Sequence, residues 1–411
     1  MMTDHGRADS VGATQAGIEV MPAVNRLARA GTRFSRAYTT CPLCVPARTA
    51  LATGVYPTQN GVVYNDWVGR TASDLPTIHE TLVGAGYRVG HVGVDHIRVR
   101  PSLQSRVPFE PWVTPEDHNR HLEEVGLATG DSLDRFRAEV TENQDGRPAR
   151  VRYSSVAVDR WVGPVEHFKD GFFAAQAVDF LRRNDDRPFA LFLYLWAPHP
   201  PLRVPEPYYS MYDPDAIELP PNVGVAAEGE PESYRSGIAA QLAEGVTIED
   251  WRRVWAAHLG LTSLADACMG RVLYALDESG RRDDTIVLYT SDHGEQLGQH
   301  RMYQKMEMYE PALRVPMVVA GPGLAVGDVD TCVSHIDIVP TLLDLLELGA
   351  AGCDGRDSAP AAAAGAADAA GADDEGRGRS LAAALSGAGL EDRVVFAQYS
   401  GNPTYGDRRR T

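Results

Sequence analysis

The 411-residue sequence predicts an α/β fold built around a large, mostly parallel β-sheet. Residues 188–196 and 285–290 are almost continuously apolar, which is typical of strands buried on both faces of such a sheet. Segments of helical periodicity alternate with these runs, as parallel strands require. Polar residues follow each run, with His199 after the first and Asp292-His293 after the second. Because chemistry gathers at the C-terminal ends of parallel strands, we expect a site there.

The other elements follow from periodicity and from helix stop signals. Apolar residues at helical spacing predict helices, and short apolar runs predict strands. We expect helices over residues 20–32, 76–85, 171–183, 248–278 and 336–346, and strands over residues 87–94, 315–320 and 394–399.

Two segments do not fit this alternation. Residues 100–160 are polar and charged with little periodicity, which indicates a variable insertion or lid. Residues 351–379 are a low-complexity tract of Ala, Gly and Asp, which favours a disordered or loosely packed insertion. We therefore expect a catalytic domain over residues 1–350, and residues 380–411 as a separate ordered segment.

Composition excludes several classes of protein. A formal net charge of −17 argues against nucleic-acid and anionic-membrane partners. Five cysteines without a regular spacing argue against a disulfide-stapled secreted domain. No apolar run approaches the ~18 residues of a membrane span, and the N-terminus has no apolar signal core. We expect a cytoplasmic protein, in which Lys169 and Lys305 are the only lysines.

The stretch around Cys44 carries the strongest chemical pattern. Cys44, Pro46 and Arg48 form Cys-x-Pro-x-Arg, in which the proline suits the first turn of a helix that Gly54 would end. A thiol at a helix N-terminus, one turn from an arginine, is expected to have a lowered pKa and to be reactive. The alternatives are a buried structural thiol or a zinc or redox pair with Cys41. A zinc site needs a second pair of ligands, and the sequence offers none at the usual spacing.

This motif at residues 44–48, extended by matching positions through residue 62, resembles the signature of the formylglycine-dependent sulfatases. The resemblance covers most of residues 3–346. It implies an alkaline-phosphatase-like three-layer sandwich with a large central sheet. It also implies that a formylglycine-generating enzyme converts Cys44 to formylglycine, whose hydrated aldehyde is the nucleophile. By the same comparison the first strand is cut to its last residues, and residues 380–411 begin an incomplete C-terminal subdomain.

The resemblance also implies a divalent metal site. Asp4 matches the first metal aspartate of the family, and Asp292-His293 matches its later Asp-Asn or Asp-His pair. With the modified Cys44 they would hold Ca²⁺ most readily, with Mn²⁺ and Mg²⁺ as alternatives. The family often has a second acid or a glutamine after the first aspartate. Here that residue is His5, whose role is left open.

Basic residues are expected to bind the substrate anion. Arg48, with the metal, would polarise the nucleophile. His199 matches the family histidine that faces the substrate, and Lys305 matches the substrate lysine.

Two further positions match only in part. The family commonly reads Gly-Lys-x-His where this chain has Val94 and His96, so the histidine is kept and a positive charge is lost. Asn65 matches an asparagine that contacts the anion in the choline-sulfatase and phosphonate-monoester-hydrolase branches; a plain turn asparagine is the alternative.

The function implied is hydrolysis of a small anionic sulfate ester. The first alternative is a phosphonate monoester or phosphodiester hydrolase with the same machinery. The second is a truncated, non-catalytic relative, which the shortened first strand and incomplete C-terminal part would favour.

Overall fold

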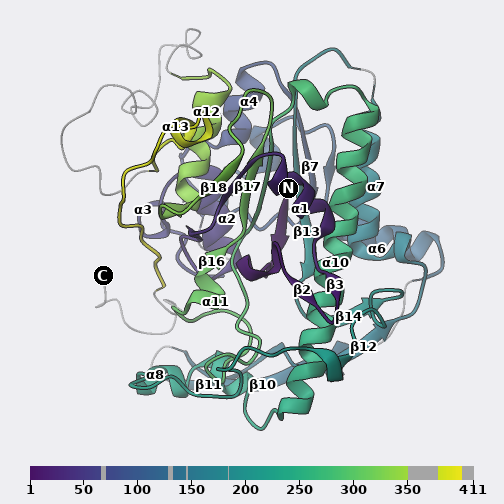
Figure 1. Cartoon of the computed structure of the whole chain (residues 1–411), viewed down its shortest axis with the longest axis vertical. Coiled ribbons are helices and arrows are strands. Elements are labelled where there is room, and N and C mark those ends of the chain that lie inside the picture. Colours follow the sequence, from purple (N-terminus) through teal and green to yellow (C-terminus); the bar gives the residue numbers. More distant parts are fainter. Residues whose placement is uncertain (66–70, 128–132, 145–146, 184, 350–377, 400–411) are drawn as a thin grey trace.

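An eight-stranded sheet with the order β18-β4-β17-β15-β1-β13-β7-β9 forms the centre of the computed structural model (Figure 1). The structure describes residues 1–65, 71–127, 133–144, 147–183, 185–349 and 378–399, so the low-complexity prediction falls almost wholly outside it. The strands are β1 Met2–Asp4, β4 Thr32–Phe34, β7 Arg88–Gly93, β9 Trp112–Val113, β13 Phe189–Pro198, β15 Val287–Ser291, β17 Met317–Ala320 and β18 Gly327–Val329.

The sheet is mostly parallel, as predicted. β1 lies at its centre and pairs in parallel with both β13 and β15. Only β17, among the described strands of this sheet, runs antiparallel to its neighbours β15 and β4. Pro316 separates β17 from the two-residue strand β16 Arg314–Val315, so the predicted strand over residues 315–320 is divided.

Helices cover both faces of the sheet, which confirms the three-layer arrangement (Figure 1). One apolar cluster contains Leu27, Phe173 and Leu264, from helices α1, α7 and α10. The other contains residues of α2, α4 and α12. The six helices are α1 Pro22–Arg29, α2 Cys44–Thr53, α4 Ile78–Gly84, α7 Lys169–Arg182, α10 Ile248–Glu278 and α12 Ile338–Leu345.

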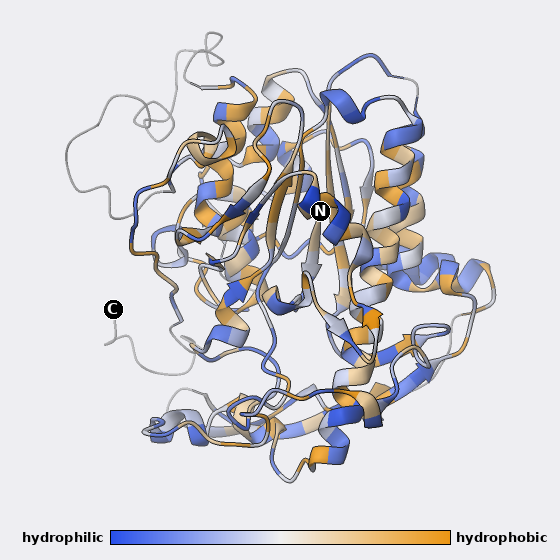
Figure 2. Ribbon diagram, viewed as in Figure 1, coloured by the Kyte–Doolittle hydropathy of each residue, from blue (hydrophilic) through white to orange (hydrophobic). Residues whose placement is uncertain are grey.

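Strand β13 shows why a continuous apolar run predicts a buried strand. Successive side chains point to opposite faces of a sheet. Accordingly Leu193 and Leu195 join the first apolar cluster, whereas Tyr194 between them joins the second. Figure 2 shows that the helices beside the sheet contain both hydrophobic and hydrophilic residues, as expected of helices with one buried side.

Smaller elements surround this core. The short helices are α3 Pro57–Asn60, α5 Leu103–Arg106, α6 Pro115–Glu124, α8 Glu232–Arg235, α9 Ile238–Leu242, α11 Glu310–Leu313 and α13 Ala382–Leu385. The two-stranded sheets pair β2 Thr14–Gln15 with β3 Ile18–Glu19, β6 Ala72–Ser73 with β8 Val99–Arg100, β10 Arg137–Gln144 with β11 Arg147–Ser154, and β12 Val158–Trp161 with β14 Leu202–Pro205. A three-stranded sheet has β5 Ala37–Tyr38 between β16 Arg314–Val315 and β19 Val333–Ser334.

Residues 100–160 are more regular than their sequence suggests. They supply β9 at the edge of the central sheet, helix α6, and the hairpin β10–β11. The hairpin lies below the C-terminal ends of the parallel strands in Figure 1. Its role as a lid stays a prediction.

The strand predicted over residues 394–399 is wrong. Residues 391–399 belong to no helix or strand. A backbone hydrogen bond of 2.7 Å runs from Gln398 N–H to the carbonyl oxygen of Thr40, in the loop before α2. A short apolar run becomes a strand only where a neighbouring strand offers a ladder of hydrogen-bond partners, and that loop offers none.

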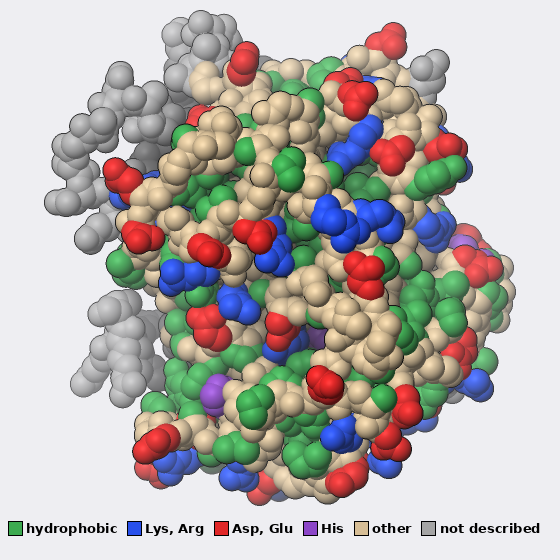
Figure 3. All heavy atoms as spheres, viewed as in Figure 1, with side chains coloured by type: hydrophobic (Ala, Val, Ile, Leu, Met, Phe, Trp, Pro, Cys, Tyr) green, Lys and Arg blue, Asp and Glu red, His purple; other side chains and the backbone are tan. Residues whose placement is uncertain are grey.

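Two further observations concern the charge on the surface and the apolarity of the helices. Figure 3 shows acidic and basic side chains intermingled on the face in view. Among the described helices, none combines the length and apolarity that crossing a bilayer requires.

Candidate active site

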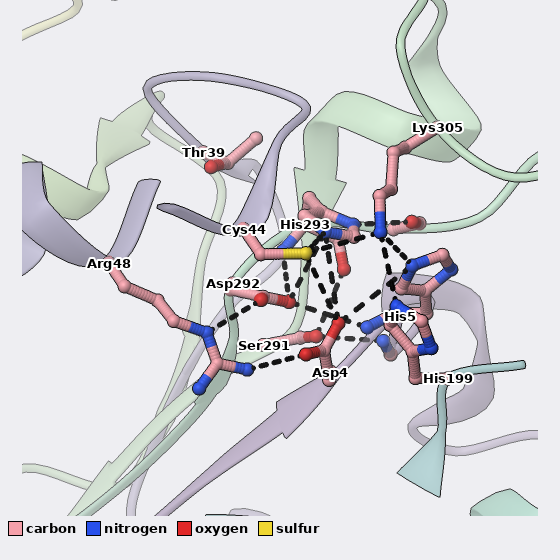
Figure 4. Close-up of polar contacts among 12 residues, drawn as sticks. Asp4, His5, Thr39, Cys44, Arg48, His199, Ser291, Asp292, His293 and Lys305 are labelled. Carbon is pink, nitrogen blue, oxygen red and sulfur yellow. Dashed lines mark hydrogen bonds and ion pairs between the residues drawn. The ribbon is translucent and has the colours of Figure 1, made fainter. Parts of the chain in front are cut away.

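Three adjacent strands deliver polar residues to one place. β1 ends at Asp4, β15 is followed by Asp292 and His293, and β13 is followed by His199. Because β1 lies between the other two and all three are parallel, their C-terminal ends meet. Figure 4 shows these side chains converging on Cys44.

Helix α2 carries Cys44 to this point. Cys44 is its first residue, and Gly54, with a φ of 68°, ends it in the left-handed conformation that glycine adopts without strain. Asn65 lies at the start of the helix, where its Oδ1 accepts a hydrogen bond of 3.1 Å from Val45 N–H. The role of Asn65 in contacting a substrate stays a prediction.

The Cys44 sulfur is surrounded by charged and titratable groups. It lies 3.2 Å from Nε2 of His293 and accepts a hydrogen bond of 3.1 Å from Nζ of Lys305. The thiol faces Oδ1 of Asp4 at 3.7 Å. These contacts bring together four of the predicted site residues from distant parts of the chain.

The expected lowering of the Cys44 pKa is wrong for the unmodified thiol. Burial, followed by the charge of Asp4, raises the pKa of Cys44 to about 12. The thiolate loses more from leaving water than it gains from the helix N-terminus and from Lys305. At neutral pH the side chain is therefore a protonated thiol and a poor nucleophile.

Arg48 holds the two aspartates. Its Nη2 donates to Asp4 Oδ2 at 2.8 Å, its Nε to Asp292 Oδ2 at 2.9 Å, and its Nη1 to the carbonyl oxygen of Val94 at 3.1 Å. The expectation that Arg48, together with the metal, polarises the nucleophile stays a prediction. In the structure the donors of Arg48 hold two carboxylates that face Cys44.

The two buried carboxylates differ in acidity. Burial and the charge of Asp292 raise the pKa of Asp4 to about 7. Although burial opposes it, the charges of His293 and Arg48 hold the pKa of Asp292 well below its usual value. Like charges this close favour one ionised and one protonated carboxyl until a cation joins them.

His5 and Glu295 belong to the cluster, although the sequence left His5 open and gave Glu295 no role. Nδ1 of His5 lies 2.5 Å from Glu295 Oε2, and its Nε2 lies 2.5 Å from Nζ of Lys305. Gly294, just before Glu295, lets the chain pass close to Pro311, because a Cβ added at this position would lie 2.0 Å from the carbonyl oxygen of Pro311. The signal available in the sequence was the position of Glu295, two residues after the metal-type histidine.

Lys305 and His199 face each other. Lys305 is only 5% exposed, and its Nζ lies 3.4 Å from Nε2 of His199. Burial and the charge of Lys305 keep the pKa of His199 well below its ordinary value, so this imidazole is neutral. Although burial opposes it, Cys44, Asp4 and Asp292 raise the pKa of Lys305, which stays charged.

The remaining basic positions lie at the edge of the cluster. His96 follows two residues after Val94, whose carbonyl oxygen contacts Arg48. Burial and the charge of Arg48 keep the pKa of His96 well below its usual value. Lys169, the second lysine, lies with its Nζ 4.0 Å from the ring centroid of Trp196.

The donor set fits a divalent cation. One ligand-type atom from each of Asp4, His5, Cys44 and His293 lies within 4.8 Å of the other three. Asp292 adds an oxygen, since its Oδ1 lies 3.7 Å from Nε2 of His293. Carboxylate oxygens with imidazole nitrogens suit Mn²⁺ and related ions, and carboxylates alone would suit Ca²⁺.

The loop that carries Lys305 gives a pH-dependent prediction. Burial, followed by the charge of Glu230, raises the pKa of Glu307 to about 8. A carboxyl group whose pKa is higher in the folded protein than in the unfolded chain stabilises the fold while it is protonated. This stabilisation is complete below the pKa of the unfolded chain and is lost as the pH rises through the pKa of the folded protein. We expect Glu307→Gln to be more stable than the parent protein at pH 9 by roughly 1.4–3 kcal/mol, the value of one to two pKa units.

Urea unfolding of both proteins at pH 4.5 and pH 9 measures this difference. The variant's advantage should shrink at the lower pH, where the glutamate is protonated in the folded state and about half protonated in the unfolded state. Glu244→Gln, at an exposed glutamate, is the control. An advantage of the same size at both pH values would contradict the assignment.

Comparisons with known proteins agree with this geometry. A protein-family model described as sulfatase matches residues 1–348. The chain is 31% identical over 364 residues to the multifunctional alkaline phosphatase superfamily protein PehA of Trinickia caryophylli, covering 79% of this chain and 68% of PehA. It is 31% identical over 348 residues to a choline-sulfatase of Rhizobium meliloti (strain 1021), covering 79% of this chain and 62% of that protein. The chain thus spans less than two thirds of the choline-sulfatase.

A solved structure is similar over nearly the whole chain. The phosphonate monoester hydrolase SpPMH from Silicibacter pomeroyi superposes with a TM-score of 0.70 and 25% identity, covering 96% of this chain and 77% of that one.

Proposed function

Because the chain belongs to the sulfatase family of the alkaline-phosphatase-like superfamily, we propose that it hydrolyses small anionic sulfate esters through a formylglycine made from Cys44 and a divalent cation. The observation that carries the proposal is the position of Cys44. Its sulfur lies at the start of α2 within 3.7 Å of Asp4, His293 and Lys305. A formylglycine-generating enzyme is the partner that this proposal requires.

The formylglycine would supply a hydrated aldehyde as the nucleophile, and a cation held by Asp4, Asp292, His293 and residue 44 would offset negative charge beside it. Arg48 keeps both aspartates in place for that cation. Nδ1 of the neutral His199 points at the carbonyl oxygen of Pro200. Because a carbonyl oxygen can only accept a hydrogen bond, Nδ1 carries the hydrogen, and Nε2 accepts a hydrogen bond from Lys305. His199 therefore orients Lys305, whose ammonium binds the sulfonate oxygens and donates toward the leaving oxygen.

Residues around this centre would complete the substrate site. We propose that the side-chain amide of Asn65 contacts the anion. The hairpin β10–β11 is the proposed lid, since Gln304 Nε2 donates to the carbonyl oxygen of Ser154 at 2.6 Å and so links the hairpin to the Lys305 loop.

Phosphonate monoester hydrolysis is the second candidate. Val94 is buried where the family commonly has a lysine, so the substrate site has one positive charge fewer. The similarity to a phosphonate monoester hydrolase also favours this reading. The test compares kcat/KM for 4-nitrophenyl sulfate and for a 4-nitrophenyl phosphonate monoester, with protein made beside a formylglycine-generating enzyme. A clear preference for the phosphonate would reverse the order of the two candidates.

Lys305→Met should slow the reaction strongly. The ammonium is buried, charged and within 3.4 Å of both Cys44 and His199, so its loss removes a fixed positive charge where negative charge develops. We expect kcat for the better substrate to fall about 10²–10³-fold, the usual effect of removing one such group.

Arg301→Met is the matched control for this variant. Arg301 is an exposed basic residue of the same loop, and its removal should leave kcat within about twofold. Steady-state kinetics with thermal melts of all three proteins separate a catalytic effect from unfolding. Parent-like kcat in a folded Lys305→Met protein would exclude this role for Lys305.

A further inference from the structure

Two imidazoles in the cluster face the same carboxylate oxygen. Nε2 of His5 lies 3.8 Å from Oδ1 of Asp4, and Nε2 of His293 lies 3.9 Å from the same atom. Their ring centroids are 4.6 Å apart. Figure 4 shows the two rings approaching Asp4 and the Cys44 sulfur from different sides. Nε2 of His5, Nε2 of His293 and the carboxylate of Asp4 thus lie around one common position.

Hydrogen bonds fix which nitrogen of each ring carries a lone pair. Nδ1 of His293 lies 2.9 Å from the carbonyl oxygen of Gly294, which can only accept, so Nδ1 bears the hydrogen. Nδ1 of His5 donates in the same way to Glu295 Oε2 at 2.5 Å. Each Nε2 is then an acceptor. A carboxylate or carbonyl behind Nδ1 is the usual support of a metal-binding histidine.

The backbone of His5 is held in an uncommon conformation. Its φ is 65°, a region that residues other than glycine seldom adopt, and its side chain is fully buried. The His5 N–H donates to Asp292 Oδ1 at 3.3 Å, which ties this backbone to the second aspartate. A strained residue that persists inside a polar cluster indicates that the surrounding contacts require its position.

We propose that His5 is a metal ligand, oriented by Glu295, and that it makes this site select a first-row transition-metal ion, such as Mn²⁺ or Zn²⁺, over Ca²⁺. Calcium prefers oxygen ligands throughout, whereas imidazole nitrogen suits the transition metals. With His5, the protein offers two nitrogens beside the oxygens of Asp4 and Asp292. This inference rests on the metal-dependent hydrolysis proposed above, and it replaces the Ca²⁺ that the sequence predicted.

The same lone pair links metal binding to Lys305. In the structure Nζ of Lys305 lies 2.5 Å from Nε2 of His5. A cation bound to that nitrogen excludes this hydrogen bond, because Nε2 has a single lone pair. The ammonium is then free to bind a substrate anion, so the metal-loaded protein should bind sulfate more tightly than the metal-free protein.

The first test measures metal selectivity in the full-length protein, matured by a formylglycine-generating enzyme and stripped with chelator. Calorimetric titration with Mn²⁺ and with Ca²⁺ should give clearly tighter binding of Mn²⁺. His5→Asp restores an oxygen ligand and should lower the Mn²⁺-to-Ca²⁺ preference about 10–100-fold. Glu295→Gln should weaken Mn²⁺ binding about tenfold. His121→Gln, on α6, is the control and should change neither affinity.

The second test counts nitrogen ligands directly. Pulsed electron paramagnetic resonance of the Mn²⁺ form should detect couplings to two ¹⁴N nuclei in the parent protein and to one in His5→Asp. Should His5→Asp not fold, the count in the parent protein decides. A single nitrogen there, or binding of Ca²⁺ at least as tight as that of Mn²⁺, would overturn the inference. A two-nitrogen Mn²⁺ site without ester hydrolysis would count against the proposed function alone.

Discussion

Cys44→Ala is expected to abolish ester hydrolysis while the protein stays folded. The side chain is small and buried beside Asp4, His293 and Lys305, so its removal deletes the proposed nucleophile and leaves the charged groups in place. We expect kcat to fall on the order of 10⁴-fold or more, as for other catalytic nucleophiles. Turnover of 4-nitrophenyl sulfate and the mass of the peptide containing residue 44 are the measurements. That mass in the parent protein should show the thiol converted to an aldehyde.

Cys44→Ser sharpens the same experiment. A serine hydroxyl is similar in size to the thiol and could attack sulfur once, but it lacks the second hydroxyl that expels sulfate from a hydrated aldehyde. At most one equivalent of product per protein is therefore expected. Continued turnover by the alanine variant would exclude residue 44 as the nucleophile. An unmodified Cys44 beside a maturation enzyme that converts a control protein would favour a non-catalytic relative, because a thiol with a pKa of about 12 is a weak nucleophile.

The sheet and its covering helices could be predicted because their signals are local. Helix α10 has the bounds predicted from periodicity, and a capping box at Thr247 marks its start. The direction of a strand has no such local signal, because the same apolar run can pair in parallel or antiparallel with its neighbour. The antiparallel setting of β17 therefore had no signal in the sequence.

The site could be predicted only as far as motifs reach. Cys44, Asp292, His293, His199 and Lys305 were found because each sits in a recognisable pattern. The partnership of His5 with Glu295 joins residues 290 positions apart, and it depends on how two strand ends meet. The high pKa of Cys44 depends on burial, which a sequence motif does not report. Both features come from tertiary packing.

Arg48→Met should cause the largest loss of stability among single changes at the site. In the parent protein the guanidinium lies within 2.9 Å of carboxylate oxygens of Asp4 and Asp292, and all three side chains are fully buried. Removing it leaves two buried carboxylates without this counter-charge. We expect the free energy of unfolding at pH 7 to fall by about 3–5 kcal/mol, the usual effect of breaking a buried ion pair. Urea unfolding in the presence of chelator measures this.

The pH dependence and a second substitution show whether the loss of stability comes from the missing counter-charge or from lost packing. In the parent protein the lowered pKa of Asp292 contributes stability at neutral pH that is lost on acidification. In Arg48→Met burial should raise that pKa, so lowering the pH from 8 to 6 should narrow the gap between the two proteins. Adding Asp292→Asn should likewise recover part of the loss. Arg33→Met, which removes a partly exposed pair with Asp328, should cost only about 0–1 kcal/mol. A loss that neither acid nor Asp292→Asn reduces would assign the effect to packing, because only a charge responds to both.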